Sequence, residues 1–444
     1  MKRELYYFDL YPKVVPVGKA TTVTVKIMEK RYCPPEGTSL TVKIIPLTEI
    51  AGSPDKYPSY EVVPQGGVFT LTHTYEKEQE YGVYILLNGE TFVQGSEFIR
   101  MGLYALEPDL YALQPLKGDF HVHSTWSDGR EMPEAVMARY REAGYDFAPI
   151  TDHYTYESSV VAQDFYKDVP IDFNIILGEE IHAPGNNVHV VNFGGAFSVC
   201  EKLKNNKEAH EKEVAEIAKN LDISFDNEDE KFKYASTVWV FEEIRKGGGL
   251  AIFPHPHWTI KANNVRDSLS RLFFQHKCFD AFELIGGHTS LENNRQTAFY
   301  YDALREGYGD VPILGCSDTH GVISDTFEGS TLPGATGPAY PFTDFYTIVF
   351  ATANEKNPII HGVKEKYSVA VETYQGGTPR VHGSYRLVSY ASFLIRDYFP
   401  LQAELCREEG RLMRRLAYHG DANAKAELTR LSGQVAALRE KYFR

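Results

Sequence analysis

The sequence is organised around one stretch, Gly118-Asp-Phe-His-Val-His-Ser-Thr-Trp-Ser-Asp-Gly129. In an extended strand alternate side chains share a face, so we expect His121 and His123 to point the same way, opposite to Phe120 and Val122. Neutral imidazoles on a common face are good ligands for a divalent metal, and Asp128 offers an oxygen ligand in the following loop. Taken alone, the H-x-H pair fits a strand with exposed histidines about equally well.

Three later stretches carry the same residue types: Thr151-Asp-His153, Pro254-His-Pro-His257 and Cys316-Ser-Asp-Thr-His320. Each follows an apolar run typical of a buried strand. Residue types suited to metal binding therefore recur where strands end. The open end of a parallel α/β barrel gathers its chemistry in this way.

A further expected strand, residues 171 to 182, ends in Leu177-Gly-Glu-Glu-Ile-His182. Alternation places Glu180 and His182 on one face and Glu179 on the other. A carboxylate between histidines can bridge two metals through its two oxygens, which is the role expected of Glu180. Glu179 is expected to be solvated, and His182 could either support a ligand or be an ordinary strand residue. The next strand, 187 to 193, carries His189.

Strands and helices alternate from Lys117 onward. A strand at 118–123, a helix at 133–143 and a strand at 146–151 predict a right-handed βαβ unit with parallel strands. Pro149 cannot donate to a strand ladder, so we expect a bulge or a sheet edge there. Helices at 235–246, 267–275 and 293–306 and strands at 250–257, 279–285 and 311–316 continue the alternation, which predicts a parallel barrel or a doubly wound sheet.

Length and composition predict a folded protein of two or three domains. The chain has 444 residues, of which 43% are hydrophobic and 24% charged. Its net charge of −14, without a long basic run, argues against nucleic acid as a partner. The sequence has no apolar run long enough for a membrane helix, and its start lacks the apolar core of a signal peptide, so a cytoplasmic protein is expected. The five cysteines are scattered and read as reduced thiols.

Three regions follow from these patterns. Residues 1–112 predict a small accessory β-sandwich, with a hairpin turn at Asn88-Gly89 and no catalytic grouping. Residues 113–375 form the α/β region with the candidate ligands. Residues 376–444 predict a helical extension that packs on the barrel or forms the interface of a homo-oligomer.

At this point the chain resembles the PHP family, the polymerase and histidinol phosphatase metallohydrolases. The matching pieces are His121-Val-His123 with Ser127-Asp-Gly129, Thr151-Asp-His153, Gly178-Glu-Glu180, His189, His255-Pro256 and Ser317-Asp-Thr-His320. They occur in the family's order within residues 117 to 350. The form of the first motif and the N-terminal β domain look most like the branch that includes carbaryl-hydrolysing enzymes.

The resemblance implies a distorted seven-stranded (β/α)7 barrel that holds two or three divalent metals, either Mn, Fe or Zn. Its implied ligands fall into three groups, of which Glu180 bridges the first two: His121, His123 and Asp318; His189 and His255; Asp128, His153 and His320. The same resemblance implies hydrolysis by a metal-bridging hydroxide.

Three functions remain open for this site. The preferred one is a phosphoesterase, either a phosphatase or a phosphodiesterase, acting on a small-molecule phosphate ester. The alternatives are an ester, carbamate or amide hydrolase with the same metals, and a non-catalytic metal-binding partner module. Asp128 and His257 are the expected catalytic residues, with His257 protonating a leaving group. The expected substrate-binding residues are Trp126, Arg266 and Arg295.

Overall fold

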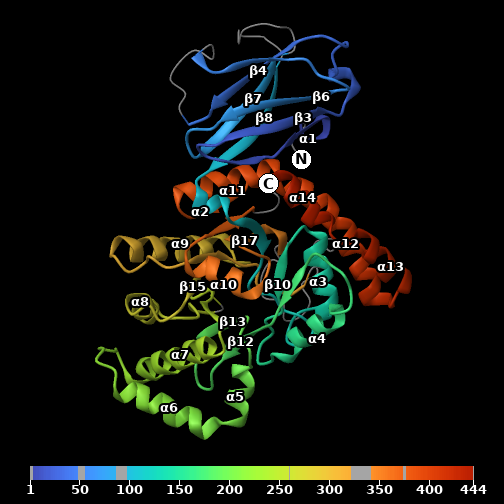
Figure 1. Ribbon diagram of the computed structural model, residues 1–444. Coiled ribbons are helices and arrows are strands. Elements are labelled where there is room, and N and C mark those ends of the chain that lie inside the picture. Colours follow the sequence, from blue (N-terminus) through green and yellow to red (C-terminus); the bar gives the residue numbers. More distant parts are fainter. Residues whose placement is uncertain are drawn as a thin grey trace. The chain divides into compact units, whose positions relative to one another are not determined.

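The computed structural model describes residues 4–48, 56–86, 98–259, 261–321, 342–373 and 377–443 (Figure 1). The chain divides into two compact units. Unit 1 consists of residues 1–114, 385–405 and 433–444, and unit 2 of residues 115–384 and 406–432. The C-terminal helices are therefore divided between the two units. The sequence had instead suggested a separate helical extension over residues 376–444.

Unit 1 contains two β-sheets. Strands β1 (Phe8–Tyr11), β3 (Ala20–Ile27) and β6 (Val68–Thr74) form an antiparallel sheet. Strands β2 (Val14–Pro16), β8 (Phe98–Leu106), β7 (Gln79–Leu86), β4 (Leu40–Pro46) and β5 (Ser59–Val62) form the other, in that order. Alternate side chains such as Val23 and Val25 are fully buried in one core that draws on both sheets. The expected turn at Asn88-Gly89 lies outside the described residues, but the strands on either side of it, β7 and β8, pair antiparallel.

Helices complete unit 1. Short helices α1 (Glu4–Tyr7) and α2 (Pro108–Tyr111) join α11 (Tyr385–Asp397) and α14 (Gln434–Phe443). The guanidinium group of Arg386 in α11 donates hydrogen bonds to Asp109 at 2.6 Å and to Glu78. On α14, Tyr442 donates a hydrogen bond to Asp9 at 2.8 Å. These bonds fix the C-terminal helices to the unit's β-strands and α2.

Unit 2 contains a mixed sheet in the order β11-β10-β9-β17-β18-β19. Its strands are β9 (Gln114–Gly118), β10 (Phe147–Pro149), β11 (Asn174–Ile176), β17 (Phe345–Ala351), β18 (Ser368–Glu372) and β19 (Arg380–His382). Strands β9, β10 and β11 are parallel, and α3 (Pro133–Glu142) connects β9 to β10. The βαβ unit expected from the sequence is thus confirmed. Its helix begins with Pro at the first position and is followed by Gly144 at a φ of 87°.

The second sheet of unit 2 has the order β12-β13-β14-β15-β16. Its strands are β12 (Gly178–His182), β13 (His189–Phe193), β14 (Leu250–Phe253), β15 (Ala281–Ile285) and β16 (Ile313–Gly315). Strands β12 and β13 form an antiparallel hairpin in which His182 faces His189, β14 is antiparallel to β13, and β14 to β16 are parallel. Isolated bridges from Val122 to Thr319 and from His153 to Glu180 join this sheet to the first. The two sheets therefore meet where the candidate ligands lie.

The first histidine pair does not lie in a regular strand, contrary to expectation. Strand β9 ends at Gly118, because the carboxylate of Asp119 accepts the N–H groups of Phe120 at 2.7 Å and His121 at 3.2 Å. Those donors are then lost to a strand ladder. An edge position for Pro149 is also wrong, because β10 lies between β11 and β9. Strand β10 pairs with β9 only at Phe147, and the N–H of Thr151 then donates to the carbonyl of Val122. Pro149 lies between these two points, so the N–H that it lacks is not needed there.

Besides α3, the described part of unit 2 contains the helices α4 (Glu157–Tyr166), α5 (Val199–Asn205), α6 (Lys207–Lys219), α7 (Glu228–Lys246), α8 (Asp267–Gln275), α9 (Ser290–Arg305), α10 (Lys356–Lys364) and α13 (Ala422–Leu431). Helix α12 (Phe399–His419) begins in unit 1 and continues in unit 2. Among the described residues, no helix has both the length and the apolar character needed to cross a bilayer.

Candidate metal centre

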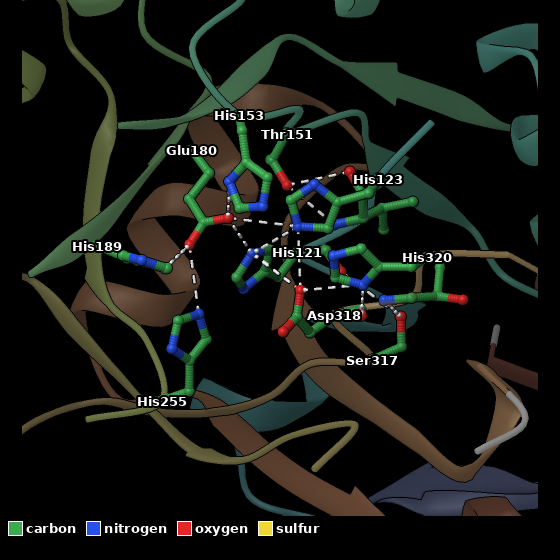
Figure 2. A network of polar contacts seen from close by, with 12 residues as sticks. His121, His123, Thr151, His153, Glu180, His189, His255, Ser317, Asp318 and His320 are labelled. Atoms are coloured by element: carbon green, nitrogen blue, oxygen red, sulfur yellow. Dashed lines mark hydrogen bonds and ion pairs between the residues drawn. The ribbon is translucent and has the colours of Figure 1, made fainter. Parts of the chain in front are cut away.

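All nine predicted ligands come together at one end of the strands of unit 2 (Figure 2). Loops that follow β9, β10, β14 and β16 supply seven of them, and β12 and β13 supply Glu180 and His189. The loops converge because the strands end at a common edge, where the two isolated bridges join the sheets. The predicted ligands are His121, His123, Asp128, His153, Glu180, His189, His255, Asp318 and His320.

Glu180 lies at the centre of the cluster, and its side chain is fully buried. Its Oε2 is 2.9 Å from Nδ1 of His153, 3.1 Å from Nε2 of His121 and 3.3 Å from Nε2 of His123. Its Oε1 is 2.8 Å from Nδ1 of His189 and 3.3 Å from Nε2 of His255. Each oxygen therefore faces its own set of imidazoles, as a bridging carboxylate requires.

Two aspartates complete the cluster on either side. Oδ1 of Asp318 lies 3.0 Å from Nε2 of His123 and 3.3 Å from Nε2 of His121. Oδ1 of Asp128 lies 3.3 Å from Nε2 of His320 and 3.6 Å from Nε2 of His153. Asp128 is 57% exposed, whereas Asp318 is 10% exposed. The Asp128 group is therefore the part of the cluster most open to a substrate.

The donor set fits divalent cations. Both oxygens of Glu180 and Oδ1 of Asp318 are buried and accept no hydrogen bond within the described structure. A buried carboxylate without donors is costly unless a cation lies beside it. Five overlapping groups of three or four side chains have donor atoms within 4.8 Å of one another. Imidazole and carboxylate ligands in such groups suit Zn, Fe and Mn.

The pKa values of these groups reflect their crowding. Burial disfavours charge on all of them, but the carboxylates of Asp318 and Glu180 raise the pKa of His121 well above its usual value. Against the same burial, Glu180 and Asp128 raise the pKa of His153 to about 10. The surrounding histidines in turn hold the pKa of Glu180 well below its usual range. The carboxylates thus stay ionised and attract cations.

Strained backbone positions occur at two of the ligands. Asp318 has a φ of 47° and His255 a φ of 26°, which side chains other than glycine rarely adopt. Tyr154, beside His153, has a φ of 61°. Such conformations persist where surrounding contacts enforce them, and they cluster at functional sites.

Two residues that the sequence interpretation missed lie against the ligands. Oε2 of Glu283, in β15, is 3.1 Å from Nδ1 of His121, so it fixes the ring with Nε2 facing the cluster. Nε2 of His288 lies 3.5 Å from Oδ2 of Asp318. A charged residue inside the apolar run 279–285 is the signal that could have identified Glu283, and His288 follows the end of a strand like the other ligands.

Two buried aspartates hold the ligand loops. Asp119 accepts hydrogen bonds from the N–H of Ser317 at 3.1 Å and from the hydroxyl of Tyr140 at 2.8 Å, and so ties the His121 loop to the Asp318 loop. Asp152 accepts the N–H of Ser124 at 2.7 Å and the hydroxyl of Ser127 at 2.5 Å. It therefore orders the loop that ends in Asp128. Each precedes a ligand histidine by one or two residues.

The environment of Glu179 differs from the one expected from the sequence. It is fully buried and not solvated. Its oxygens accept the N–H groups of Val199 at 2.6 Å and Cys200 at 3.2 Å, and the hydroxyl of Ser198 at 2.7 Å. These are the first residues of α5 and its N-cap, so Glu179 neutralises a buried helix N-terminus.

His182 supports a ligand. Its Nε2 is 2.8 Å from Nδ1 of His153, its ring centroid is 3.8 Å from that of His189, and Nδ1 is 3.2 Å from the hydroxyl of Tyr154. Trp258 adds an aromatic wall, with ring centroids 5.8 Å from His189 and 5.9 Å from His255.

The remaining predicted residues lie elsewhere. His257 is buried, its Nε2 is 3.3 Å from Asp267 and its ring centroid is 5.1 Å from that of Phe299, so these described contacts place it against α8 and α9. Arg266 and Arg295 are exposed, and neither contacts a ligand within the described structure. Trp126 is 47% exposed in the loop between His123 and Asp128. The expected roles of His257, Arg266 and Arg295 therefore gain no geometric support.

Comparisons with known proteins give partial similarities. No protein-family model matches the chain. A curated relative, the DNA polymerase/3′-5′ exonuclease PolX of Bacillus subtilis, is 38% identical over 104 residues, which cover 18% of this chain and 18% of that protein. The chain thus spans less than a fifth of that relative's length.

Three solved structures are also similar. A two-domain protein from Bacteroides vulgatus that contains a predicted PHP-like metal-dependent phosphoesterase is 18% identical and covers 58% of this chain and 65% of its own, with a TM-score of 0.39. A proposed metal-dependent phosphoesterase from Bifidobacterium adolescentis is 18% identical and covers 50% of this chain and 92% of its own, with a TM-score of 0.34. An amidohydrolase from Chromobacterium violaceum is 17% identical and covers 49% of this chain and 92% of its own, with a TM-score of 0.32. TM-scores below 0.5 do not establish a common fold, so the case for a function depends on the side chains of this chain.

Proposed function

We propose that the protein is a metal-dependent phosphoesterase of the PHP type that acts on a small-molecule phosphate ester. One observation carries the proposal: the buried carboxylate of Glu180 has histidine nitrogens within 3.3 Å of each of its oxygens and no hydrogen-bond donor in the described structure. A bridging carboxylate of this kind is suited to a two-metal site.

Each group of ligands has a distinct task. His121, His123 and Asp318 would hold one metal, His189 and His255 a second, and Asp128, His153 and His320 a third, with Glu180 shared by the first two. When bound, such metals activate water as a nucleophile and polarise the oxygen of the attacked group. Glu283 and His182 orient ligand rings, and the exposed Asp128 group faces the incoming substrate.

A cation near the third ligand group favours phosphate as the substrate. Arg130 lies two residues after Asp128, and a Cβ placed on Gly321 would come within 2.9 Å of its Cβ, so Arg130 packs beside the residue that follows His320. Guanidinium groups bind phosphate oxygens well. An ester, carbamate or amide hydrolase is the second candidate, favoured by the aromatic rings of Trp258 and Tyr154 at the cluster.

The seven-stranded barrel belongs to the same proposal. With the two isolated bridges, strands β9, β10, β12, β13, β14, β15 and β16 can be followed as a ring that returns to β9. Strand β13 is antiparallel to both neighbours, which is the distortion in this ring. We also propose that unit 1 is an accessory β-sandwich. Assembly into a homo-oligomer stays a prediction.

The proposal is tested with three chromogenic substrates: a phosphate monoester, a phosphate diester and a carboxylic ester. Protein reconstituted with Mn, Fe or Zn is compared with a His121→Ala variant. Turnover of a phosphoester that the variant loses supports the proposal. Turnover of the carboxylic ester alone would replace it with the second candidate, and tight metal binding without any turnover on a broad panel would favour a non-catalytic metal-binding module.

A further inference from the structure

A cavity of about 660 Å³ lies beside the metal cluster in unit 2. Its walls come from the loop between β12 and β13, from α5 and the start of α6, and from α7. Figure 1 shows these three helices gathered at the end of the unit where β12 and β13 lie. His182 lines the cavity and is 2.8 Å from His153, so the cavity extends to the edge of the ligand set.

The charged side chains that line the cavity are all basic, although the chain as a whole is acidic. Lys204, Lys207 and Lys233 line it, and no lining residue is Asp or Glu. Acidic residues outnumber basic ones in the sequence by 60 to 46, so a wall with three lysines and no acidic residue has a charge opposite to that of the whole chain. Three lysines at one concave surface attract anions.

The carboxylates that pair with these lysines do not line the cavity. Glu201 lies 2.8 Å from Lys204, and Asp229 lies 2.9 Å from Lys233. These carboxylates are 53% and 67% exposed, and Glu211, 3.9 Å from Lys207, is 60% exposed. Ion pairs between exposed side chains contribute little, so an anionic ligand can take over the ammonium groups.

The rest of the wall is mainly apolar. Leu203, Cys200 and Ala183 are nearly fully buried behind it, and Pro184 and the aliphatic lysine stems add to it. Tyr154 stands at the side of the ligands, with its ring 4.6 Å from that of His182. A ligand that fills the cavity therefore meets imidazoles, apolar surface and ammonium groups.

We propose that this cavity binds the part of the substrate that is not attacked, and that this part carries a second negative charge on an apolar spacer. This inference rests on the proposed phosphoesterase function and specifies its substrate class. Lys204, Lys207 and Lys233 bind the second anion, which is a carboxylate or a further phosphate. The apolar wall contacts the spacer.

The test uses a series of ω-phosphonocarboxylates with spacers of increasing length, each compared with its methyl ester. Phosphonates are not hydrolysed, so calorimetry on the metal-reconstituted protein measures binding alone. The acids are expected to bind about tenfold more tightly than the esters at the best spacer length, because each exposed charge pair contributes a small amount. A parallel series of bisphosphonates distinguishes a second phosphate from a carboxylate.

The lysines are then replaced together, as Lys204→Gln, Lys207→Gln and Lys233→Gln. The preference for acid over ester is expected to disappear in this variant. Lys219→Gln is the matched control, because Lys219 is an exposed α6 lysine with a similar partner, Glu216 at 3.9 Å, and does not line the cavity. It should keep the preference. The single charge reversal Lys207→Glu, at a 68% exposed position, should weaken binding of the acids without a risk to folding.

Equal binding of acids and esters by the parent protein would overturn the inference, and so would a preference that survives the triple replacement. Turnover is measured separately with the phosphate esters of the corresponding ω-hydroxy acids. If the acids bind preferentially but no phosphate ester is hydrolysed, the cavity assignment holds and the proposed reaction is wrong. If the phosphate esters are hydrolysed but the phosphonocarboxylic acids bind no more tightly than their methyl esters, the proposed reaction holds and the cavity assignment is wrong.

Discussion

Glu179 and Glu180 are neighbours of the same type with opposite environments. Because successive strand residues face opposite sides, Glu180 meets histidine nitrogens, whereas Glu179 meets the N–H groups at the start of α5. Both are completely buried. One carboxylate is therefore placed for metals and the other for a helix N-terminus.

Replacing each of the two residues separates these tasks. Glu180→Gln is expected to reduce bound metal and to lower kcat/KM by more than about 100-fold, since partners that only orient ligands are worth about 10–100-fold. Glu179→Gln should keep its metal but lower the free energy of unfolding by about 1–3 kcal/mol, because charge-assisted bonds to the helix are weakened. Elemental analysis and urea denaturation of both variants distinguish the outcomes. Loss of metal in Glu179→Gln alone would contradict the assignment.

Glu283→Gln tests the residue behind His121. Burial raises the pKa of Glu283 to about 7, whereas the adjacent His121 lowers it and so favours the ionised carboxylate that accepts from Nδ1. The amide holds the ring less firmly, and metal affinity is expected to fall about 10–100-fold while the fold is retained. Competition with a chelator measures the affinity. An unchanged affinity would show that His121 is positioned without Glu283.

At the residue scale the nine residues that the sequence singled out lie close together, and their role as ligands stays a prediction. Most of them stand in short motifs that follow apolar runs. It could not predict Glu283, because its partner His121 is distant in sequence and only strand pairing brings the two together. The same limit applies to Glu179, whose burial depends on where α5 begins. His257 shared a motif with His255, but the φ of 26° at His255 redirects the chain and leaves His257 beside Asp267.

At the scale of elements, a buried histidine is part of the packing between helices α6 and α7. His210 of α6 is 3% exposed and its ring centroid is 4.6 Å from that of Trp239 in α7, whose Nε1 donates to Glu213. Neither ring nitrogen of His210 has a hydrogen-bond partner within the described structure. Burial lowers its pKa below the ordinary 6.5, although Glu211 and Glu213 oppose this shift.

The pH dependence of stability follows from that pKa. Below pH 6.5, His210 is protonated more readily in the unfolded chain than in the fold, where the ring is buried. The free energy of unfolding therefore decreases as the pH falls below 6.5. His210→Gln removes this group. Urea denaturation at pH 7.5 and 5.5 is expected to show a smaller loss of stability for the variant than for the parent. An equal loss in both proteins would mean that His210 is protonated without cost in the fold.

Helix α12 contributes a buried ion pair to unit 2. Arg141 is fully buried, and its Nη2 is 2.8 Å from Oε2 of Glu409, while Oε1 of Glu409 accepts the N–H of Asp172 at 2.7 Å. Removing one partner of a buried pair leaves an uncompensated charge. Glu409→Gln is therefore expected to lower the free energy of unfolding by about 3 kcal/mol.

Glu408 is the matched control for this substitution. It is 46% exposed and pairs with Arg411 one helical turn away, so Glu408→Gln should change stability by no more than about 0.5 kcal/mol. Equal effects of the two substitutions would show that Asp146, 3.9 Å from Arg141, is sufficient to balance the charge.

Periodicity predicted most elements closely: the helix expected at 267–275 is α8, and the one expected at 133–143 is α3. It failed where side chains compete with the backbone ladder. Asp119 ends β9 early, and no spacing rule shows that its carboxylate takes two N–H groups. It also could not show that β12 and β13 form an antiparallel hairpin, because apolar strands look alike in either direction.

At the scale of the whole molecule, metal removal should affect the two units unequally. All nine predicted ligands belong to unit 2, and so do the three tryptophans, Trp126, Trp239 and Trp258. Tryptophan fluorescence therefore reports on unit 2 alone. A ligand at about 1,000 times its Kd stabilises by about 4 kcal/mol, so chelation should lower the fluorescence-detected Tm by on the order of 10 °C.

Glu180→Gln provides the control for chelation, because its Tm should respond little to metal or chelator. A parent Tm that stays constant on chelation would contradict a metal centre built into unit 2. A change in periodicity near Lys117 led us to expect a boundary between the β and α/β parts there. It could not predict how the C-terminal helices divide, because amphipathic helices do not specify which surface covers them.

The path of the chain through the two units has a consequence for synthesis on the ribosome. Unit 1 needs residues 385–405 and 433–444, and unit 2 needs residues 406–432. The strands beside the predicted ligands emerge early, but Glu409, the partner of Arg141, emerges much later. Neither unit can finish folding during translation of its own strands, because each unit also contains helices that are translated after those strands.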